Sequence, residues 1–139
     1  MTVSIAISSS SIAELLLAES ALRHHLNANS KRLLTADRTP ALIRLTCPAV
    51  AELAAELKAS STHSADHIIH TLTLTVPPGT DTGALRQLIE QAVAAKVGVA
   101  AYAGVDSKVA AHYATDRATA LANIKLFLSA DAKILPSAV

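Results

Sequence analysis

The chain has 139 residues, a formal charge of +1 and an aliphatic composition, with 51% apolar but only 2% aromatic residues. This length fits one domain and is too short for two ordinary ones. The near-zero charge excludes nucleic-acid or membrane binding through a basic face. The single cysteine, Cys47, excludes an internal disulfide and favours a reducing compartment.

At the N-terminus, Thr2 to Ser8 alternates apolar and small polar residues, which predicts a short strand or an extended arm. This start lacks the cationic region and the continuous apolar run of a secretion signal. Ser11 and Glu14 have the spacing of a capping box, so we expect a helix from there to about Leu26. Glu19 interrupts the apolar stripe of that helix, which indicates that the helix is only partly covered in one subunit.

The next stretch, Lys31 to Pro40, is polar and is interpreted as a connection. Ala41 to Cys47 alternates and is predicted to be a strand. Pro48 is tolerated as a first helical residue, and a short helix follows it to Lys58, although a ragged strand over residues 49–59 could use the same residues. Ser60 to Asp66 is expected to be a flexible polar tip.

The most regular alternation in the chain is His67 to Val76, which predicts a strand buried on one face and wet on the other. The buried face would carry Ile68, His70, Leu72, Leu74 and Val76, and the wet face His67, Ile69, Thr71, Thr73 and Thr75. Pro77 to Gly83 forms a turn, after which Thr80 or Asp81 caps a helix. Its apolar stripe consists of Leu85, Leu88, Ile89, Ala92, Val93 and Val97.

Beyond that helix, Gly98 to Gly104 is predicted to be a short strand and Leu121 to Ala130 a closing strand. Val105 to Ala120 stays open, because its helical composition is weakened by Asp116 and two threonines. The order of elements predicts an α+β fold. We expect residues 1–139 to form a single two-layer domain, with a mixed, mostly antiparallel sheet and helices mainly on one face.

Three histidines invite a metal hypothesis, because His63, His67 and His70 lie close together beside Asp66. A zinc site needs three or four converging donors. His67 and His70 fall on opposite faces of the predicted strand, and His63 falls in the polar tip. Polar histidines at a strand entry are therefore the favoured interpretation, and we expect no metal and no cofactor.

Cys47, at a predicted strand-to-helix junction, would have its thiolate favoured by a helix N-terminus. It lacks a flanking glycine-rich loop and a second cysteine, so a small buried residue is the better interpretation. The turn at Pro77 to Gly83 lacks the lysine of a phosphate loop, and Asp81 would repel an anion. Glu52 and Glu56 are interpreted as helix-surface carboxylates. No catalytic residue is predicted.

Five segments together resemble a known layout. These are AESALRHHL, PALIRLTC, HIIHTLTLTV, GTDTGAL and NIKLFLSA. The chain resembles the small tail-terminator or tail-completion (neck) proteins of tailed bacteriophages, over most of its length but without a diagnostic motif. It departs from them at Thr2 to Ser8 and at Ala49 to Ala59, where such proteins often have a loop.

The resemblance implies a non-enzymatic structural protein that forms a homo-oligomeric ring, commonly a hexamer, in a virion or tail-like particle assembled in the bacterial cytoplasm. Its partners would be copies of itself together with tail-tube and connector proteins, with no direct contact to nucleic acid or membrane. From expected exposure, the subunit contacts would be Thr71, Thr73, Thr75, Leu33, Leu34 and Phe127.

Two other classes of function stay open. The first is a small α/β ligand-binding or regulatory module that holds a ligand near Pro77 to Thr82. The second is an enzyme that depends on Cys47 or on the cluster from His63 to His70.

Overall fold

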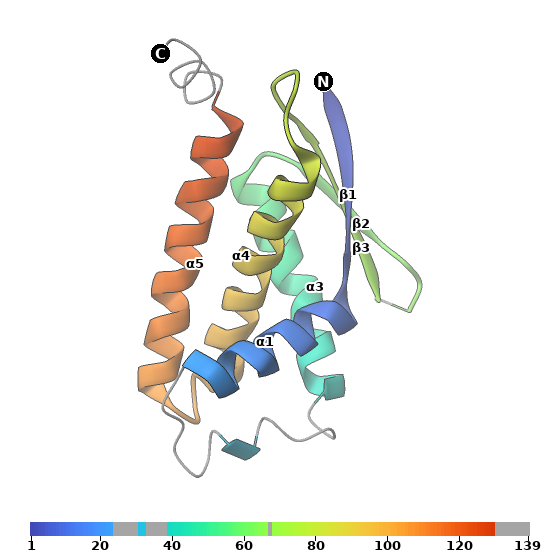
Figure 1. The fold of residues 1–139 in the computed structure, drawn as a ribbon. Coiled ribbons are helices and arrows are strands. Elements are labelled where there is room, and N and C mark those ends of the chain that lie inside the picture. The colour runs from blue at the N-terminus through green and yellow to red at the C-terminus, as the bar shows by residue number, and fades with distance from the viewer. Residues whose placement is uncertain (24–30, 33–38, 67, 130–139) are drawn as a thin grey trace.

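The computed structural model describes residues 1–23, 31–32, 39–66 and 68–129. In chain order the elements are β1 (Thr2–Ser8), α1 (Ser9–Arg23), α3 (Thr39–Glu56), β2 (Ser60–His63), β3 (Ile69–Thr75), α4 (Thr82–Tyr102) and α5 (Ser107–Leu128). The expected α+β class is confirmed. The helices form a layer on one side of the sheet, and α5 lies across that layer from the strands (Figure 1).

The three-stranded sheet has the order β1-β3-β2, and both pairings are antiparallel. The strand expected at residues 67–76 is therefore confirmed as the central strand, over Ile69–Thr75, while His67 lies outside the described residues. The N-terminal segment, which could have been an arm, is the edge strand β1 and pairs with β3 along its whole length.

The core lies between the sheet and the helices. The period of two places Leu72 and Leu74 of β3 on the same side as Ile5 and Ile7 of β1, and all four are at most 4% exposed. The expected wet and buried faces of the central strand are thus observed.

Helix α1 begins earlier than the sequence suggested. It starts at Ser9, and the Ser8 hydroxyl accepts a hydrogen bond from the Ser11 N–H at 3.5 Å. The prediction of a helix start at the Ser11–Glu14 capping box is therefore wrong, because strand β1 runs directly into the serine run and a serine next to the strand takes the capping role. The predicted end near Leu26 lies outside the described residues.

The strand predicted at residues 41–47 is wrong, because this segment is the first half of α3. Leu42, Thr46 and Leu53 are buried at helical spacing, and the Thr46 hydroxyl donates to the Leu42 carbonyl at 3.2 Å. Pro48 lies inside this helix rather than at its first position. The predicted helix after it is confirmed up to Glu56, as part of this longer helix.

The flexible tip predicted at residues 60–66 contains a strand. Ser60–His63 forms β2, with all four residues exposed, and it pairs antiparallel with β3. At the turn that follows, the Ser64 hydroxyl donates to Asp66 Oδ1 at 2.5 Å, and the same oxygen accepts from the Ile68 N–H at 3.1 Å. The polar residues of this segment thus form the hairpin that aligns β2 with β3.

Asp81 caps α4, as one of the two expected residues, by accepting hydrogen bonds from the N–H groups of Gly83 and Ala84 at 3.1 Å. The strand predicted at residues 98–104 is wrong, because α4 continues to Tyr102. The two glycines of that segment suggested a break, but Gly98 is a helical residue whose missing side chain makes room for a neighbouring helix.

The closing strand predicted at residues 121–130 is also wrong as far as it is described, because α5 extends from Ser107 to Leu128 and takes in most of the segment left open. Its buried residues recur at helical spacing and are Val109, Tyr113, Ala120 and Ile124. Within the described residues, none of the helices combines the length and hydrophobicity needed to cross a bilayer.

Candidate functional site

In the part of the chain that the structure describes, the helices all lie on one side of the sheet and none covers its outer face. This face consists of the residues that alternate with the buried ones, and we call it the hydroxyl face: Thr2, Ser4, Ala6, Ser60, Thr62, Ile69, Thr71, Thr73 and Thr75. None of these residues is charged. Threonine is common on strand faces because it is β-branched. An uncharged face of hydroxyl and apolar groups can be solvated, and it can also pack against another flat surface.

The centre of the hydroxyl face is Thr73. The register places it opposite Ser4 on β1 and Ser60 on β2. Its hydroxyl lies 3.1 Å from the Ser4 hydroxyl in a hydrogen bond, so two neighbouring strands are linked on this face. Thr71 and Thr73 are half-buried because their strand is central, whereas Thr75 is exposed.

The six predicted contact residues do not form one surface. Thr71, Thr73 and Thr75 lie together on the hydroxyl face. Phe127 belongs to α5 and is half-buried against the core. Helix α5 lies across the helical layer from the strands (Figure 1). Leu33 and Leu34 lie outside the described residues.

His63 and His70 are direct neighbours across β2 and β3, with ring centroids 6.3 Å apart in an edge-to-face arrangement. The expectation that His63 lies in a mobile tip is therefore wrong. His70 is buried and its Nε2 lies 2.8 Å from the Ser9 hydroxyl. Among the described residues, no group of three or more histidine, cysteine or acidic side chains could hold a metal ion. His67 lies outside them.

The Ser9–His70 pair has the spacing of a nucleophile and its base, but the two side chains are only 0% and 1% exposed. A substrate would have to displace the start of α1 to reach Ser9. The bond instead joins the first residue of α1 to the central strand, next to the backbone bond from the Ser9 N–H to the Ile68 carbonyl at 2.7 Å. Its role is therefore structural.

Cys47 lies in the middle of α3 and is half-buried. The expected position at a helix N-terminus is wrong, so the dipole argument for a reactive thiol no longer applies. At residues 77–83, the Thr80 hydroxyl donates to the Pro77 carbonyl at 2.6 Å, and the Asp81 side chain accepts hydrogen bonds from the first backbone N–H groups of α4. This segment is a capped turn, as expected.

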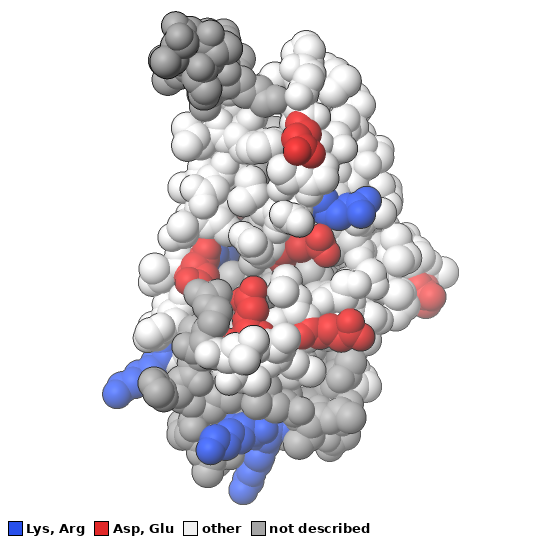
Figure 2. Space-filling model, in the orientation of Figure 1, with Lys and Arg blue, Asp and Glu red and all other residues white. Residues whose placement is uncertain are grey.

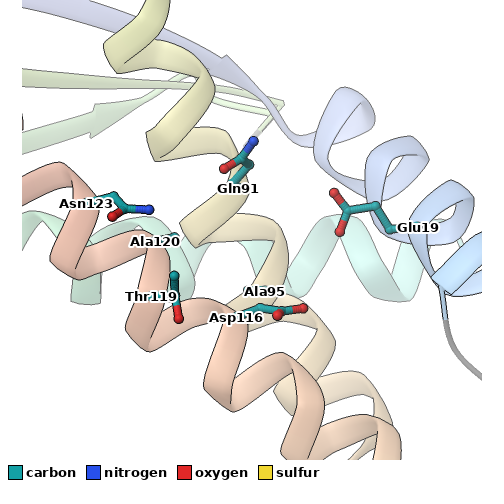
Figure 3. Close-up of a pocket in the computed structure, with 7 residues that line it drawn as sticks. All are labelled: Glu19, Gln91, Ala95, Asp116, Thr119, Ala120 and Asn123. Carbon is teal, nitrogen blue, oxygen red and sulfur yellow. The ribbon is translucent and has the colours of Figure 1, made fainter.

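A polar pocket of about 220 Å³ opens where α1, α4 and α5 meet (Figure 3). It is lined by Glu19, Gln91, Ala95, Asp116, Thr119, Ala120 and Asn123. Glu19 reaches from α1 toward the other two helices, and Asp116 reaches from α5 toward α4 (Figure 3). The described residues of the lining supply two carboxylates, two amides and a hydroxyl, so the pocket suits a small molecule that donates hydrogen bonds.

Two residues of this pocket, Glu19 and Asp116, are also visible in the sequence as interruptions of a helical pattern. Glu19 interrupts the apolar stripe of its helix, and Asp116 weakens the helical pattern of its own segment. Glu19 and Asp116 can be assigned to the same pocket only when it is known that α1 and α5 both pack against α4. Acidic side chains also gather over the middle of these helices in the view of Figure 2, while basic ones lie mostly toward the lower end.

Two stacked tyrosines, one from α4 and one from α5, are buried next to α1. Tyr102 and Tyr113 have ring centroids 5.8 Å apart, and the Tyr113 hydroxyl lies 2.6 Å from the Ser20 hydroxyl in a buried hydrogen bond. The Tyr102 hydroxyl is buried without a hydrogen-bond partner among the described residues. Burial raises the pKa of Tyr102, the negative charge of Asp106 raises it further, and the nearby Ser20 hydroxyl opposes them.

Comparisons with models of protein families, with curated proteins and with solved structures found no match. The function must therefore be argued from the surfaces and the pocket described above.

Proposed function

We propose that this protein is a non-enzymatic, self-assembling structural subunit whose copies contact one another through the β-sheet side of the molecule. The observation that carries the proposal is the hydroxyl face. It is uncharged, it lies opposite the helical layer, and the three threonines expected to make contacts lie on it in one row.

The composition supports the same proposal. The buried side chains are mostly alanine, valine, leucine and isoleucine, with two large aromatic residues, Tyr102 and Tyr113. Small aliphatic side chains each bury little area, so contacts with a second subunit add stability that the monomer lacks.

The more specific form of the proposal is a ring subunit of a virion or tail-like particle, of the phage tail-terminator type. It rests on the sequence resemblance alone. Two of the segments that carry the resemblance are helical where strands were expected: PALIRLTC lies in α3, and residues 123–128 of NIKLFLSA lie in α5. Within HIIHTLTLTV, Ile69–Thr75 forms the expected strand, and the turn before α4 is also as expected.

Light scattering after size-exclusion chromatography tests the self-assembly proposal. We expect a species larger than the 14.4 kDa monomer, and electron microscopy would show whether it is a ring. Thr73→Lys places a charge at the centre of the hydroxyl face and should reduce the assembled mass. Thr115→Lys places the same charge on an exposed threonine of α5 and should not. A strictly monomeric wild-type protein at high concentration would refute the proposal.

The polar pocket favours a second candidate function, a small binding module for an amine. The ligand would lie between Glu19 and Asp116 rather than near Pro77 to Thr82, the position expected from the sequence. Titration with putrescine, a small diamine, tests this function. We expect it to raise the melting temperature of the wild-type protein and to leave that of Asp116→Asn unchanged, without a change in mass. Equal increases in the melting temperature of both proteins would exclude the pocket as the binding site.

A further inference from the structure

Among the described residues, no strand pairs with the outer edge of β1, which we call the open edge. The sheet order places β1 at one side, paired with β3 over all seven of its residues. Native edge strands are usually shortened, charged, broken by proline or twisted by a bulge, which prevents pairing with other chains. β1 has no charge and no proline, and its register with β3 is continuous.

The backbone of the open edge can be assigned from the register. The Val76 N–H donates to the Met1 carbonyl and the Ser9 N–H donates to the Ile68 carbonyl, both at 2.7 Å. Odd-numbered residues therefore direct their backbone groups toward β3, because antiparallel pairs alternate. The even-numbered residues direct theirs toward the open edge, and three of these, Thr2, Ser4 and Ala6, are exposed.

The sequence of β1 is complementary to itself when it is reversed. Read as TVSIAIS, it has Ile5 at its centre, a small residue on each side, then Val3 or Ile7, and a hydroxyl residue at each end. An antiparallel pair centred on Ile5 would place Ser4 opposite Ala6 and Val3 opposite Ile7 of the second copy. The hydrogen-bonding pattern also allows this pairing, because Ser4 and Ala6 direct their backbone N–H and C=O groups toward the open edge.

We propose that two copies of this chain pair through β1 in antiparallel orientation, about a two-fold axis at Ile5, and form one continuous six-stranded sheet. This inference rests on the self-assembly proposed above and adds a second contact, at the sheet edge beside the hydroxyl face. The pairing adds roughly six to eight backbone hydrogen bonds. It also covers the half-buried Val3, which lies on the core side of the edge.

The two-fold axis has a consequence for the outer surface. Because it runs perpendicular to the sheet, the hydroxyl faces of both copies lie on the same side of the dimer. The uncharged surface of the dimer is then twice that of one copy. Pairing at the edge and packing on the face are therefore compatible steps of one assembly.

Cross-linking tests the pairing and its register. Two variants, Ser4→Cys and Ala6→Cys, are made in a Cys47→Ser background and oxidised with glutathione disulfide, separately and as a mixture. Residues directly opposite one another on antiparallel strands lie within disulfide reach, whereas diagonal ones do not. We expect a cross-linked dimer in the mixture but not in either variant alone. Cross-linking of Ser4→Cys alone would overturn the register centred on Ile5.

A third variant, Thr73→Cys in the same background, separates this inference from the proposed function. Cross-linking through Thr73→Cys, with none in the mixture, would show face-to-face packing, so edge pairing would be wrong while self-assembly stands. A monomeric wild-type protein with no cross-link in any sample would overturn both.

A proline variant tests the hydrogen bonds directly. Ala6→Pro removes an N–H that faces the open edge and leaves the bonds to β3 in place. It should raise the dissociation constant of the dimer by about tenfold or more, because two symmetric hydrogen bonds are lost. Ala6→Ser keeps the N–H and should dissociate like the wild type. Equal dissociation of Ala6→Pro and Ala6→Ser, both folded by circular dichroism, would overturn the inference.

Discussion

The ring of Tyr113 lies directly against Gly98. A Cβ atom built on Gly98 would fall 2.6 Å from Tyr113 Cγ, closer than any real contact of that kind. Gly98 is near the C-terminal end of α4 and Tyr113 is in the first half of α5. The absence of one side chain thus lets α4 and α5 approach, and the ring that fills the space is stacked on Tyr102.

The first prediction follows from this contact. Gly98→Ala should lower the free energy of unfolding by about 1–3 kcal/mol, because the added methyl group overpacks the helix crossing. The change should be unfavourable even though alanine is the better helix former by about 1 kcal/mol. Gly104→Ala is the control. A Cβ there meets no atom within 4 Å, so its effect should stay within about 0.5 kcal/mol. Urea denaturation measures both, and a more stable Gly98→Ala would contradict the observed contact.

The two stacked tyrosines should respond oppositely to loss of their hydroxyl groups. Tyr113→Phe removes the partner of the buried Ser20 hydroxyl and should cost about 1 kcal/mol of unfolding free energy. Tyr102→Phe removes a buried hydroxyl that has no hydrogen-bond partner among the described residues, so it should be neutral or stabilising. Thermal or urea unfolding of the two variants compares them directly. A larger loss for Tyr102→Phe would show that its hydroxyl has a partner.

Alkaline pH provides a third prediction. Burial raises the pKa of Tyr102 above its ordinary value of 10.0, so the folded state keeps its proton when the unfolded state loses it. The unfolded state then binds fewer protons than the folded state, and stability falls as pH rises above about 10. Tyr102→Phe should show a shallower decline than the wild type between pH 9 and 11. Parallel curves would indicate that Tyr102 does not contribute to the loss.

The central part of the fold could be predicted from the sequence because its signals are local. The strand Ile69–Thr75 has seven residues of strict alternation, and Asp81 follows a Pro-Pro-Gly turn that ends it. The alternation and the capping residue each involve only a few neighbouring residues, so the strand and the helix start can be predicted without knowing any distant contact.

The wrong strands have a shared physical cause. In residues 41–47 and 121–128, apolar and polar residues alternate over a short window, yet the buried positions Leu42, Thr46 and Leu53 recur at helical spacing over a longer one. Alternation over so few residues does not distinguish a strand from a helix, and Pro48, which suggests a helix boundary, lies inside the helix. The pocket could not be predicted, because Glu19 and Asp116 meet only through the packing of three helices.

Pro48 is the subject of a fourth prediction. It is exposed and lies inside α3, where it cannot donate a hydrogen bond to the Arg44 carbonyl. Pro48→Ala restores that donor and should raise the free energy of unfolding by about 1–2 kcal/mol, somewhat less than the propensity difference of roughly 3 kcal/mol. Pro40→Ala is the matched control, because Pro40 lies in the first turn of the same helix, where a proline lacks no bond. If Pro48→Ala is destabilising, the shape that the proline gives α3 is required for packing.

Arg117 joins two helices that are distant in the sequence. It reaches from α5 to α3, donating to both carboxylate oxygens of Glu56 and to Glu52 at 3.3 Å, and Lys96 of α4 lies 3.2 Å from Glu52. From the sequence alone, these glutamates are expected to be surface carboxylates. The Arg117 side chain is only 16% exposed, so it also buries its apolar stem between the helices.

A double-mutant cycle separates these two contributions. Arg117→Ala should cost about 1 kcal/mol or more, and its coupling with Glu56→Gln should be about 0.5–1 kcal/mol, because the glutamate is one-third exposed. The coupling should fall in 1 M NaCl, whereas the packing part of the Arg117→Ala loss should not. Lys125→Ala removes an exposed cation of the same helix and should change stability by less than about 0.5 kcal/mol. A coupling near zero at low salt would mean that the Arg117 stem, and not its charge, holds α5 against α3.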